Sequence, residues 1–380
     1  MTMSRISAAS AALALLLTSA CGPSPQSAPA PSQRNPRTQA ELDSLRRNTV
    51  IENSRPDLPA RAGMLVVANQ LDASATVLNA TTLQTIATVR VGNGPHEVAV
   101  SPDGRWAVVT NYGTRESEGN TLSVIDLGLA RPAVARTIDL GAYHRPHGSA
   151  FVGGGTKLLV TSETSQRLLV VDFASGRVDT ALATNARGSH MVAVQRDGRR
   201  AWTANVADGT VTEFDVDRRA TGRTYPSTKS GEGIAATPAG TQVWVGSNTE
   251  HTVTVIETAT GEAIESIDGI GAAYRIGITR SGRYALVSDP TSNRLWVYEV
   301  ASRKRVAELD LAAERAITPT GNIAAGPEGM AFDPIADFAY VSLHGTNQVA
   351  AVDLAQMRVA GVGAVGLGPD GIAYSPLVPR

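Results

Sequence analysis

The chain has 380 residues, a formal net charge of −1 at pH 7, 42% hydrophobic residues and 36 glycines. This is too much apolar material and too little net charge for an intrinsically disordered chain. Binding to nucleic acid needs a clustered basic face, and the sequence shows none, so the composition excludes a nucleic-acid partner.

The first twenty residues have the organisation of a signal peptide. Arg5 supplies a positive charge, residues 8–17 form an apolar run, and the small residues 18–20 precede Cys21. The run is too short to span a bilayer, which takes roughly 20 residues. Small residues before a lone cysteine resemble the lipobox of bacterial lipoproteins, although leucine is commoner than Thr18 three places before the cysteine. The resemblance implies lipidation at Cys21, with a secreted protein as the alternative.

The segment after Cys21 is rich in Pro, Ser and Ala and shows no sustained strand alternation, which is typical of a tether. Gly22 stands where such lipoproteins often carry an aspartate for inner-membrane retention, so an outer-membrane address is preferred, in the periplasm or at the cell surface. We therefore expect a signal peptide over 1–20, a lipid-anchored tether over 21–62 and a folded domain over 63–380. With one cysteine, no disulfide can form within the chain.

A unit of about 42 residues recurs throughout the folded domain. In the clearest copy, four β-branched strands cover 98–101, 106–112, 120–126 and 133–140, with Gly, Asp or Asn turns between them. The corresponding first strands begin near Gly148, Met191, Gly233, Arg275, Gly329 and Gly371. Four-stranded units at this spacing are typical of the blades of a β-propeller.

The two ends of the repeat region complement each other. Residues 64–91 supply a second, third and fourth strand, and the chain finishes with a first strand at 371–376. A blade built from both termini leaves no open edge. We therefore predict an all-β fold, a seven-bladed β-propeller with four-stranded antiparallel blades. Its ring is closed by the C-terminal innermost strand, which joins the three N-terminal strands.

Several motifs resemble the YVTN-type β-propeller repeat, a WD40-like repeat of exported and cell-surface proteins. They are GPHEVAVSPDG at 94–104, VTNY at 109–112, LSVID at 122–126 and TIDLG at 137–141. The resemblance covers nearly all of the mature chain and implies the same propeller fold. It implies no single function, because related propellers include structural surface proteins, lactonase-like enzymes and streptogramin lyases.

The residue just before each first strand is expected to ring one mouth of the central channel, where loops commonly build binding sites. Aligned on the first histidine of the repeat, the seven ring positions are His96, His147, His190, Glu232, Tyr274, Glu328 and Asp370. Histidines from three consecutive blades thus face an arc of carboxylates. The remaining histidines are expected in loops on the same face, and they are His144, His251 and His344.

Imidazoles and carboxylates in one funnel suit either metal binding or acid–base chemistry. The candidate metal ligands are His96, His147, His190, Glu232 and Asp370. The expected cofactor is a divalent transition metal, Zn or Cu, because three histidines with an open position suit zinc and imidazole also suits copper. The other candidate ligand-binding residues at the mouth are Tyr274, Arg275, Glu328, His144, His251 and His344. For each histidine, a structural hydrogen bond to a neighbouring blade remains the alternative.

Other prominent residues are expected to be structural. The four tryptophans should pack between blades, and they are Trp106, Trp202, Trp244 and Trp296. The aspartates that end the third strands should cap turns, and they are Asp126, Asp172, Asp215 and Asp353. The chain has no Walker loop, no Gly-x-Ser-x-Gly elbow, no Cys-x-x-Cys-His and no His-Glu-x-x-His.

Two functions are consistent with these features, and the sequence leaves open whether the protein is an enzyme. The first is a lipid-anchored, monomeric binding module of the cell envelope, whose loop face holds an envelope protein, a glycan or a small molecule, with or without a metal. The second is a lactonase-like hydrolase or a lyase, with a divalent metal at the mouth and a His or Glu base. Catalysis requires at least three ring side chains to point at one spot, whereas a binding face tolerates divergence.

Overall fold

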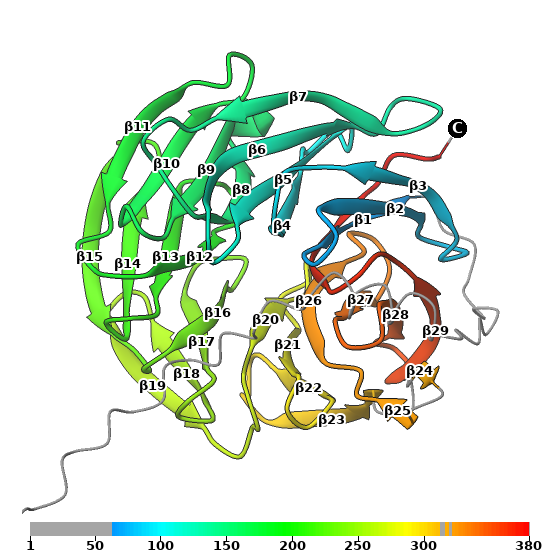
Figure 1. Ribbon diagram of the computed structural model, residues 1–380. Helices are drawn as coiled ribbons and strands as arrows, with labels where there is room; N and C mark the ends of the chain where they lie inside the picture. Colours follow the sequence, from blue (N-terminus) through cyan, green and yellow to red (C-terminus); the bar gives the residue numbers. More distant parts are fainter. Residues whose placement is uncertain (1–62, 312–315, 319–320, 380) are drawn as a thin grey trace, which may run out of the picture. The chain divides into compact units, whose positions relative to one another are not determined.

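The computed structural model describes residues 63–311, 316–318 and 321–379, so the predicted signal peptide, Cys21 and the tether lie outside the described residues. The described chain forms seven four-stranded antiparallel sheets arranged as the blades of a ring (Figure 1). This confirms the predicted all-β, seven-bladed propeller. The described residues include one short 3₁₀ helix, η1 (Gly153–Gly155), and none of their helices is long and apolar enough to cross a membrane.

Every blade has the same strand order from the centre of the ring outward. The innermost strands are β4 (Pro95–Val100), β8 (Pro146–Val152), β12 (Ser189–Val194), β16 (Gly231–Ala236), β20 (Arg275–Ile278), β26 (Pro327–Phe332) and β30 (Pro369–Ser375). The second strands are β1 (Met64–Asn69), β5 (Trp106–Gly113), β9 (Lys157–Ser162), β13 (Arg200–Asn205), β17 (Gln242–Ser247), β21 (Tyr284–Asp289) and β27 (Phe338–Leu343).

The outer half of each blade repeats in the same way. The third strands are β2 (Ser74–Asn79), β6 (Glu118–Asp126), β10 (Arg167–Asp172), β14 (Thr210–Asp215), β18 (Thr252–Glu257), β22 (Arg294–Glu299) and β28 (Gln348–Asp353). The outermost strands are β3 (Thr85–Arg90), β7 (Ala133–Asp139), β11 (Val178–Ala183), β15 (Ala220–Pro226), β19 (Glu262–Ile267), β23 (Arg305–Asp310) and β29 (Arg358–Ala364). A separate two-stranded hairpin, β24 (Ala316–Thr318) and β25 (Gly321–Ile323), lies between β23 and β26 in the chain.

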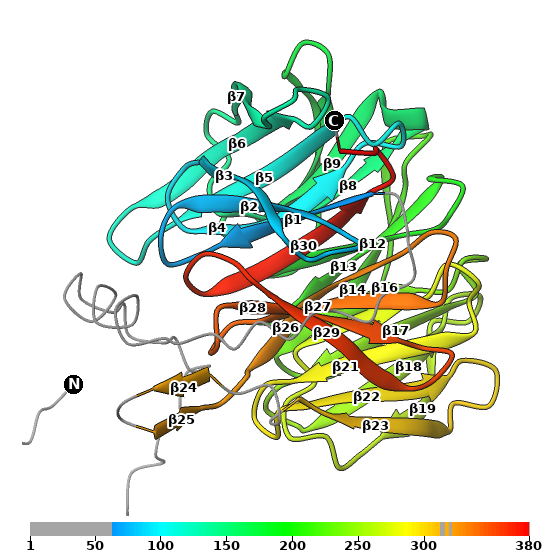
Figure 2. The ribbon, with the colours of Figure 1, turned by 90° about the vertical axis from the view of Figure 1, so that its right-hand side faces the viewer.

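The C-terminal strand closes the ring as the sequence predicts. β30 pairs antiparallel with β1, with Leu65 opposite Tyr374 and Val66 opposite Ala373, so the two ends of the domain lie side by side (Figure 2). The Ser375 hydroxyl also donates a 2.6 Å hydrogen bond to the Gly104 carbonyl in the next blade. The terminal strand therefore links two blades.

The core lies between the blades. Second and third strands are buried on both faces because each sheet packs against two neighbours, whereas outermost strands such as β3 and β19 are largely exposed and β29 is partly buried. Trp202 and Trp244 are fully buried in these interfaces, as predicted, and Trp296 is buried beside Trp244. Each third-strand aspartate accepts a hydrogen bond from a backbone N–H of the following turn, as Asp126 does from Gly128 at 2.8 Å, which confirms the predicted capping role.

Glycines let the innermost strands approach closely at the centre of the ring. A Cβ on Gly148 would lie 2.6 Å from the Val192 backbone nitrogen, and one on Gly371 would lie 2.4 Å from the His96 carbonyl. These distances exclude any side chain at the two positions. Each glycine directly follows a ring residue, so the close approach brings the ring side chains of neighbouring blades into contact.

Candidate functional site

The predicted ring positions occupy equivalent places at the start of the innermost strands. Six are the second residue of their strand and Tyr274 directly precedes β20. Hydroxyl groups of the second strands fix the backbone of the ring: Thr161 donates to the His190 carbonyl, and Ser342 donates to the Asp370 carbonyl at 2.6 Å. In both cases the hydroxyl and the ring residue belong to adjacent blades. Each innermost strand also contacts the innermost strands of both neighbouring blades, so the seven positions form one continuous circle.

A second ring of side chains, which sequence reasoning missed apart from His344, lies next to the first. Its members share one backbone hydrogen bond, from their N–H to the carbonyl two residues before a ring residue, as Glu163 donates to Arg145 at 3.1 Å. They are Gln70, Tyr112, Glu163, Val206, Asn248 and His344. The repeat could have predicted them, because five directly follow their second strand and Tyr112 lies near the end of β5 (Trp106–Gly113).

The three ring histidines lie against one another. The ring centroids of His96 and His147 are 4.9 Å apart in an edge-on arrangement, and those of His147 and His190 are 3.8 Å apart. Tyr112 stacks on His96 with a centroid distance of 4.3 Å, and the Gln70 amide nitrogen lies 3.2 and 3.1 Å from the two ring nitrogens of His96. We call His96, His147 and His190, with Tyr112 and Glu163, the histidine arc.

Burial keeps two of these histidines in the form that binds metals. It lowers the pKa of His147 well below its ordinary value, and the neighbouring His190 and His96 lower it further. Burial also lowers the pKa of His96 to about 4, although the charge of Glu97 opposes this. Both imidazoles are therefore neutral at pH 7, and a neutral imidazole nitrogen is a metal ligand.

His190 and Glu163 form an ion pair within this arc. The Nδ1 of His190 lies 3.2 Å from Oε2 of Glu163, and the Tyr112 hydroxyl donates to the same oxygen at 3.0 Å. Burial alone would lower the pKa of His190, but the hydrogen bond and charge of Glu163 raise it above its ordinary value. Burial alone would raise the pKa of Glu163, but the hydrogen bond and charge of His190 lower it.

One set of metal-ligating atoms converges in this arc. One ligand atom each from His147, Glu163 and His190 lie within 4.8 Å of one another. The Nδ1 of His147 and the Nε2 of His190 are buried without any hydrogen-bond partner. Two imidazoles and one carboxylate with an open position fit zinc, and the imidazoles also fit copper.

The structure distributes the five predicted ligands over the mouth. His147 and His190 belong to the converging set, and Glu163 joins them although it was not among the predicted ligands. His96 contacts His147 but lies outside the set. Oε2 of Glu232 lies 3.9 Å from Nε2 of His190, and Asp370 lies in the opposite half of the mouth, beside Arg275.

The opposite half consists of Glu232, Tyr274, Glu328 and Asp370, which we call the acidic arc. Arg275 is buried among its carboxylates. Its Nη2 donates to Glu97 Oε1 at 2.9 Å and lies 3.5 Å from Asp370 Oδ1, and its Nη1 lies 3.8 Å from Glu232 Oε2. Its guanidinium also lies over the Tyr274 ring at 4.6 Å.

The carboxylates of this half are held in different ways. Nδ1 of His344 lies 3.0 Å from Oε2 of Glu328, with both side chains buried. Asp370 is 1% exposed, and neither of its carboxylate oxygens has a hydrogen-bond partner. Burial raises the pKa of Asp370 to about 6, against the lowering effect of Arg275 and with a further rise from Glu328. Burial and the carboxylates Glu328 and Asp370 likewise raise the pKa of Tyr274.

The last two predicted mouth residues lie in the surrounding loops. His251 is exposed and its Nδ1 lies 2.6 Å from the Gly271 carbonyl. The backbone of His144 contacts two serines, accepting from the Ser162 hydroxyl at 2.6 Å and donating to Ser165. Neither histidine takes part in the ring contacts described above.

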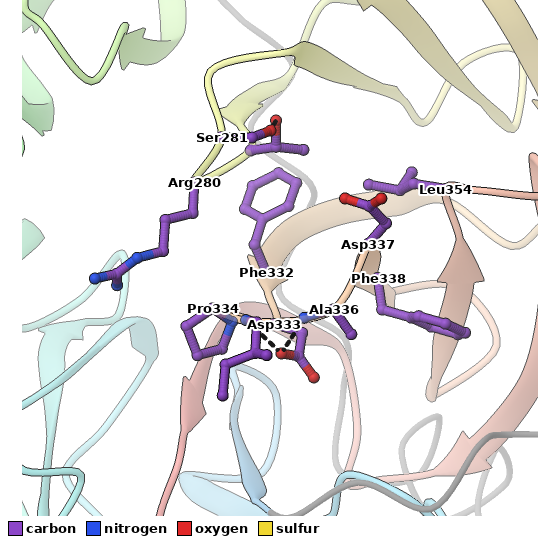
Figure 3. Close-up of a pocket in the computed structure, with 11 residues that line it drawn as sticks. Arg280, Ser281, Phe332, Asp333, Pro334, Ala336, Asp337, Phe338 and Leu354 are labelled. Carbon is purple, nitrogen blue, oxygen red and sulfur yellow. Dashed lines mark hydrogen bonds between the residues drawn. The ribbon is translucent and has the colours of Figure 1, made fainter.

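A separate cavity lies at the opposite ends of the strands, away from the histidines. It measures about 270 Å³ and is lined by the β20–β21 and β26–β27 turns (Figure 3). Oδ1 of Asp333 accepts the backbone N–H groups of Ile335 and Ala336 at 2.8 and 2.9 Å, which is the geometry of a capped turn. The mouth, where imidazoles and carboxylates converge, is therefore the candidate functional site.

Comparison with known proteins supports the fold. No family model and no curated protein sequence matches the chain. Among solved structures, the fold is similar to hydrazine synthase from Kuenenia stuttgartiensis, with a TM-score of 0.63 and 19% identity over 74% of this chain and 90% of that one. It is also similar to a protein of unknown function from Desulfotomaculum acetoxidans, with a TM-score of 0.67 and 15% identity over 83% and 99% of the two chains. At these identities the likeness shows a seven-bladed β-propeller, without support for the YVTN-type family in particular.

Proposed function

We propose that this protein is a cell-envelope binding module that holds one divalent transition-metal ion at the mouth of its propeller, through His147, Glu163 and His190. The observation that carries the proposal is the convergence of one ligand atom each from His147, Glu163 and His190 within 4.8 Å of one another. Each of the two histidines also has a buried ring nitrogen without a hydrogen-bond partner. A buried polar atom without a partner is costly, and a metal ion supplies the missing interaction. The three ligands leave a coordination position open for a small ligand above the channel.

The surroundings of the three ligands favour a metal. The Tyr112 hydroxyl holds the Glu163 carboxylate at 3.0 Å, which is the kind of outer interaction that orients metal ligands. Neutral His147 needs no deprotonation, whereas His190 must give up the proton that Glu163 favours. Zinc and copper both suit this donor set.

The envelope location is part of the proposal and rests on the sequence alone. The signal-peptide pattern and the lipobox-like residues before Cys21 favour an exported lipoprotein, preferably at the outer membrane. The residues 21–62 would then act as a tether between the lipid and the propeller. The ligand would be an envelope protein, a glycan or a small molecule that approaches the loop face.

A second candidate function is a metal-dependent hydrolase or lyase of the lactonase-like kind. One observation favours it: Glu232, a ring carboxylate outside the converging set, has its Oε2 3.9 Å from Nε2 of His190. When bound, the metal would polarise a substrate carbonyl. Glu232 would then serve as the proton acceptor beside it. A panel of γ- and δ-lactones tests this candidate, which predicts metal-dependent hydrolysis that Glu232→Gln abolishes.

Elemental analysis of the untagged full-length protein, purified without chelator, tests the metal site. We expect about one equivalent of zinc or copper per chain, and near-complete loss of it in His147→Ala, His190→Ala and Glu163→Gln. His251→Gln is the matched control, because it removes an exposed imidazole from the same face and should retain the metal. A folded wild-type protein that takes up neither Zn²⁺ nor Cu²⁺ on titration would overturn the proposal.

A further inference from the structure

The carboxylates around the centre of the ring differ in how well they are compensated. Glu97 accepts two hydrogen bonds from Arg275, Glu163 is held by His190 and Tyr112, and Glu328 lies 3.0 Å from His344. Asp370 has no hydrogen-bond partner on either oxygen, and Nη2 of Arg275 lies 3.5 Å from its Oδ1. Of these four carboxylates, Asp370 is therefore the one that is buried with neither oxygen accepting a hydrogen bond.

Arg275, the cation buried among these carboxylates, directs its side-chain hydrogen bonds at Glu97, and its Nη1 has no hydrogen-bond partner. This leaves its contacts with Glu232 and Asp370 at 3.8 and 3.5 Å. Both of these lie beyond the 2.7–2.9 Å typical of a charge-assisted hydrogen bond. A buried carboxylate that accepts no hydrogen bond is strongly unfavourable, so the position of Asp370 favours an additional donor.

The spacing of the carboxylates in the acidic arc suits an organic cation better than a metal ion. Metal ligands must lie around one ion at about 2 Å, so their atoms must be close to one another. Across the described residues, the set that meets this condition is His147, Glu163 and His190, and no carboxylate of the acidic arc belongs to it. Carboxylates that are spread along β16, β26 and β30 suit a larger cation whose N–H groups point in several directions.

We propose that the acidic arc is a subsite for the N–H-bearing organic cation of a ligand, an ammonium or guanidinium group, and that Asp370 is its principal acceptor. The cation enters from the loop face, donates to the two oxygens of Asp370, and is flanked by Glu328 and Glu232. This subsite deepens the proposed binding function but does not depend on the metal, because none of its three carboxylates belongs to the converging set. A ligand that occupies both halves of the mouth carries a metal-binding group at one end and an amine or guanidine at the other.

Isothermal titration calorimetry on the full-length protein tests the subsite with n-butylammonium and butylguanidinium as probes. 1-Butanol is the uncharged comparison, and tetramethylammonium is a cation of similar charge without N–H groups. We expect both N–H cations to bind at least about tenfold more tightly than either comparison compound. Equal binding of tetramethylammonium would overturn the proposal, because it would show attraction by charge alone.

Substitutions locate the binding. Asp370→Asn should weaken n-butylammonium binding by at least about tenfold, and Glu328→Gln should weaken it less. Glu116→Gln is the control, because it removes one exposed carboxylate from the same face and should leave binding unchanged. Unchanged binding in both Asp370→Asn and Glu328→Gln would overturn the assignment, and so would displacement of n-butylammonium by Ca²⁺ or Zn²⁺ from chelator-treated protein.

The titrations are run on both chelator-treated and zinc-loaded protein, so that a failure of the cation subsite can be distinguished from a failure of the metal site. Binding of n-butylammonium to protein that takes up no zinc would support the subsite and contradict the metal proposal. Zinc uptake without any binding of n-butylammonium would support the metal proposal and contradict the subsite.

Discussion

The two halves of the mouth occupy the same structural positions and carry opposite chemistry. In the histidine arc, the side chains contact one another through stacked rings and the His190–Glu163 pair, and His147 and His190 each keep one ring nitrogen without a hydrogen-bond partner. In the acidic arc, one guanidinium lies among carboxylates and leaves Asp370 without a hydrogen bond. The contrast shows that the propeller repeat determines the position of a ring side chain but not the type of residue at that position. Each half is therefore expected to recognise a different part of a ligand.

The histidine arc and the acidic arc are also connected by direct contacts, so a change in one can be tested for its effect on the other. β30 carries Asp370 and lies between β26 and β4, next to His96. Arg275 of the acidic half donates to Glu97, the residue after His96.

The largest effect is expected from removing the strand that joins the halves. Deletion of residues 369–380 leaves β1 without its innermost partner and opens the ring. We expect it to abolish most of the roughly 5–15 kcal/mol of unfolding free energy that is typical of a domain. Thermal unfolding followed by circular dichroism measures this, with deletion of residues 378–380 as the control. An unchanged melting temperature for the longer deletion would contradict ring closure by β30.

Two substitutions, one in each half of the mouth, should each weaken the binding of a different ligand. Glu163→Gln is expected to lower the affinity for Zn²⁺ about 100-fold and to leave n-butylammonium binding nearly unchanged. Asp370→Asn is expected to lower n-butylammonium affinity and to change Zn²⁺ affinity little, because Asp370 lies outside the converging set. Competition with a chromophoric chelator gives the zinc affinities. Loss of both affinities in either variant would show that the mouth is one undivided site.

Asp370→Asn should also make the protein more stable at neutral pH. The pKa of Asp370 in the folded protein is about 6, above its ordinary value of 3.8, so the folded state holds a proton that the unfolded chain has released between these pH values. Unfolding free energy therefore falls as the pH rises through this window. The groups that set this pKa besides burial include Arg275, Glu328, His344 and His190.

The asparagine side chain cannot ionise, so the Asp370→Asn variant does not lose unfolding free energy as the pH rises through this window. It should gain roughly 1–3 kcal/mol of unfolding free energy over the wild type at pH 7, and the gain should vanish below about pH 4. Urea unfolding at several pH values measures it. A variant that is less stable than the wild type at pH 7 would indicate that ionised Asp370 is well compensated, which the proposed subsite does not allow.

The sequence predicts the fold and one ring of the mouth because both repeat at a fixed period. Strand order, closure by residues 371–376 and the ring from His96 to Asp370 are all periodic features of the chain. Glu163 and Tyr112 were missed because they contact ring histidines across a blade boundary, from another part of the repeat: Glu163 contacts His190 and Tyr112 contacts His147. Arg275 was predicted at the mouth, but its burial among three carboxylates depends on how neighbouring blades pack, which the repeat does not reveal.

The smallest effect should come from the Tyr112 hydroxyl, which tests whether the histidine arc is organised for a metal. Tyr112→Phe keeps the ring that stacks on His96 at 4.3 Å and removes the 3.0 Å hydrogen bond to Glu163. Without it the carboxylate is less firmly oriented, and Zn²⁺ affinity should fall about tenfold. Tyr112→Leu, which also removes the stacked ring, should lower the Zn²⁺ affinity further. Equal zinc affinity in Tyr112→Phe and the wild type would mean that the hydroxyl orients no metal ligand, and that the ring alone accounts for the role of Tyr112.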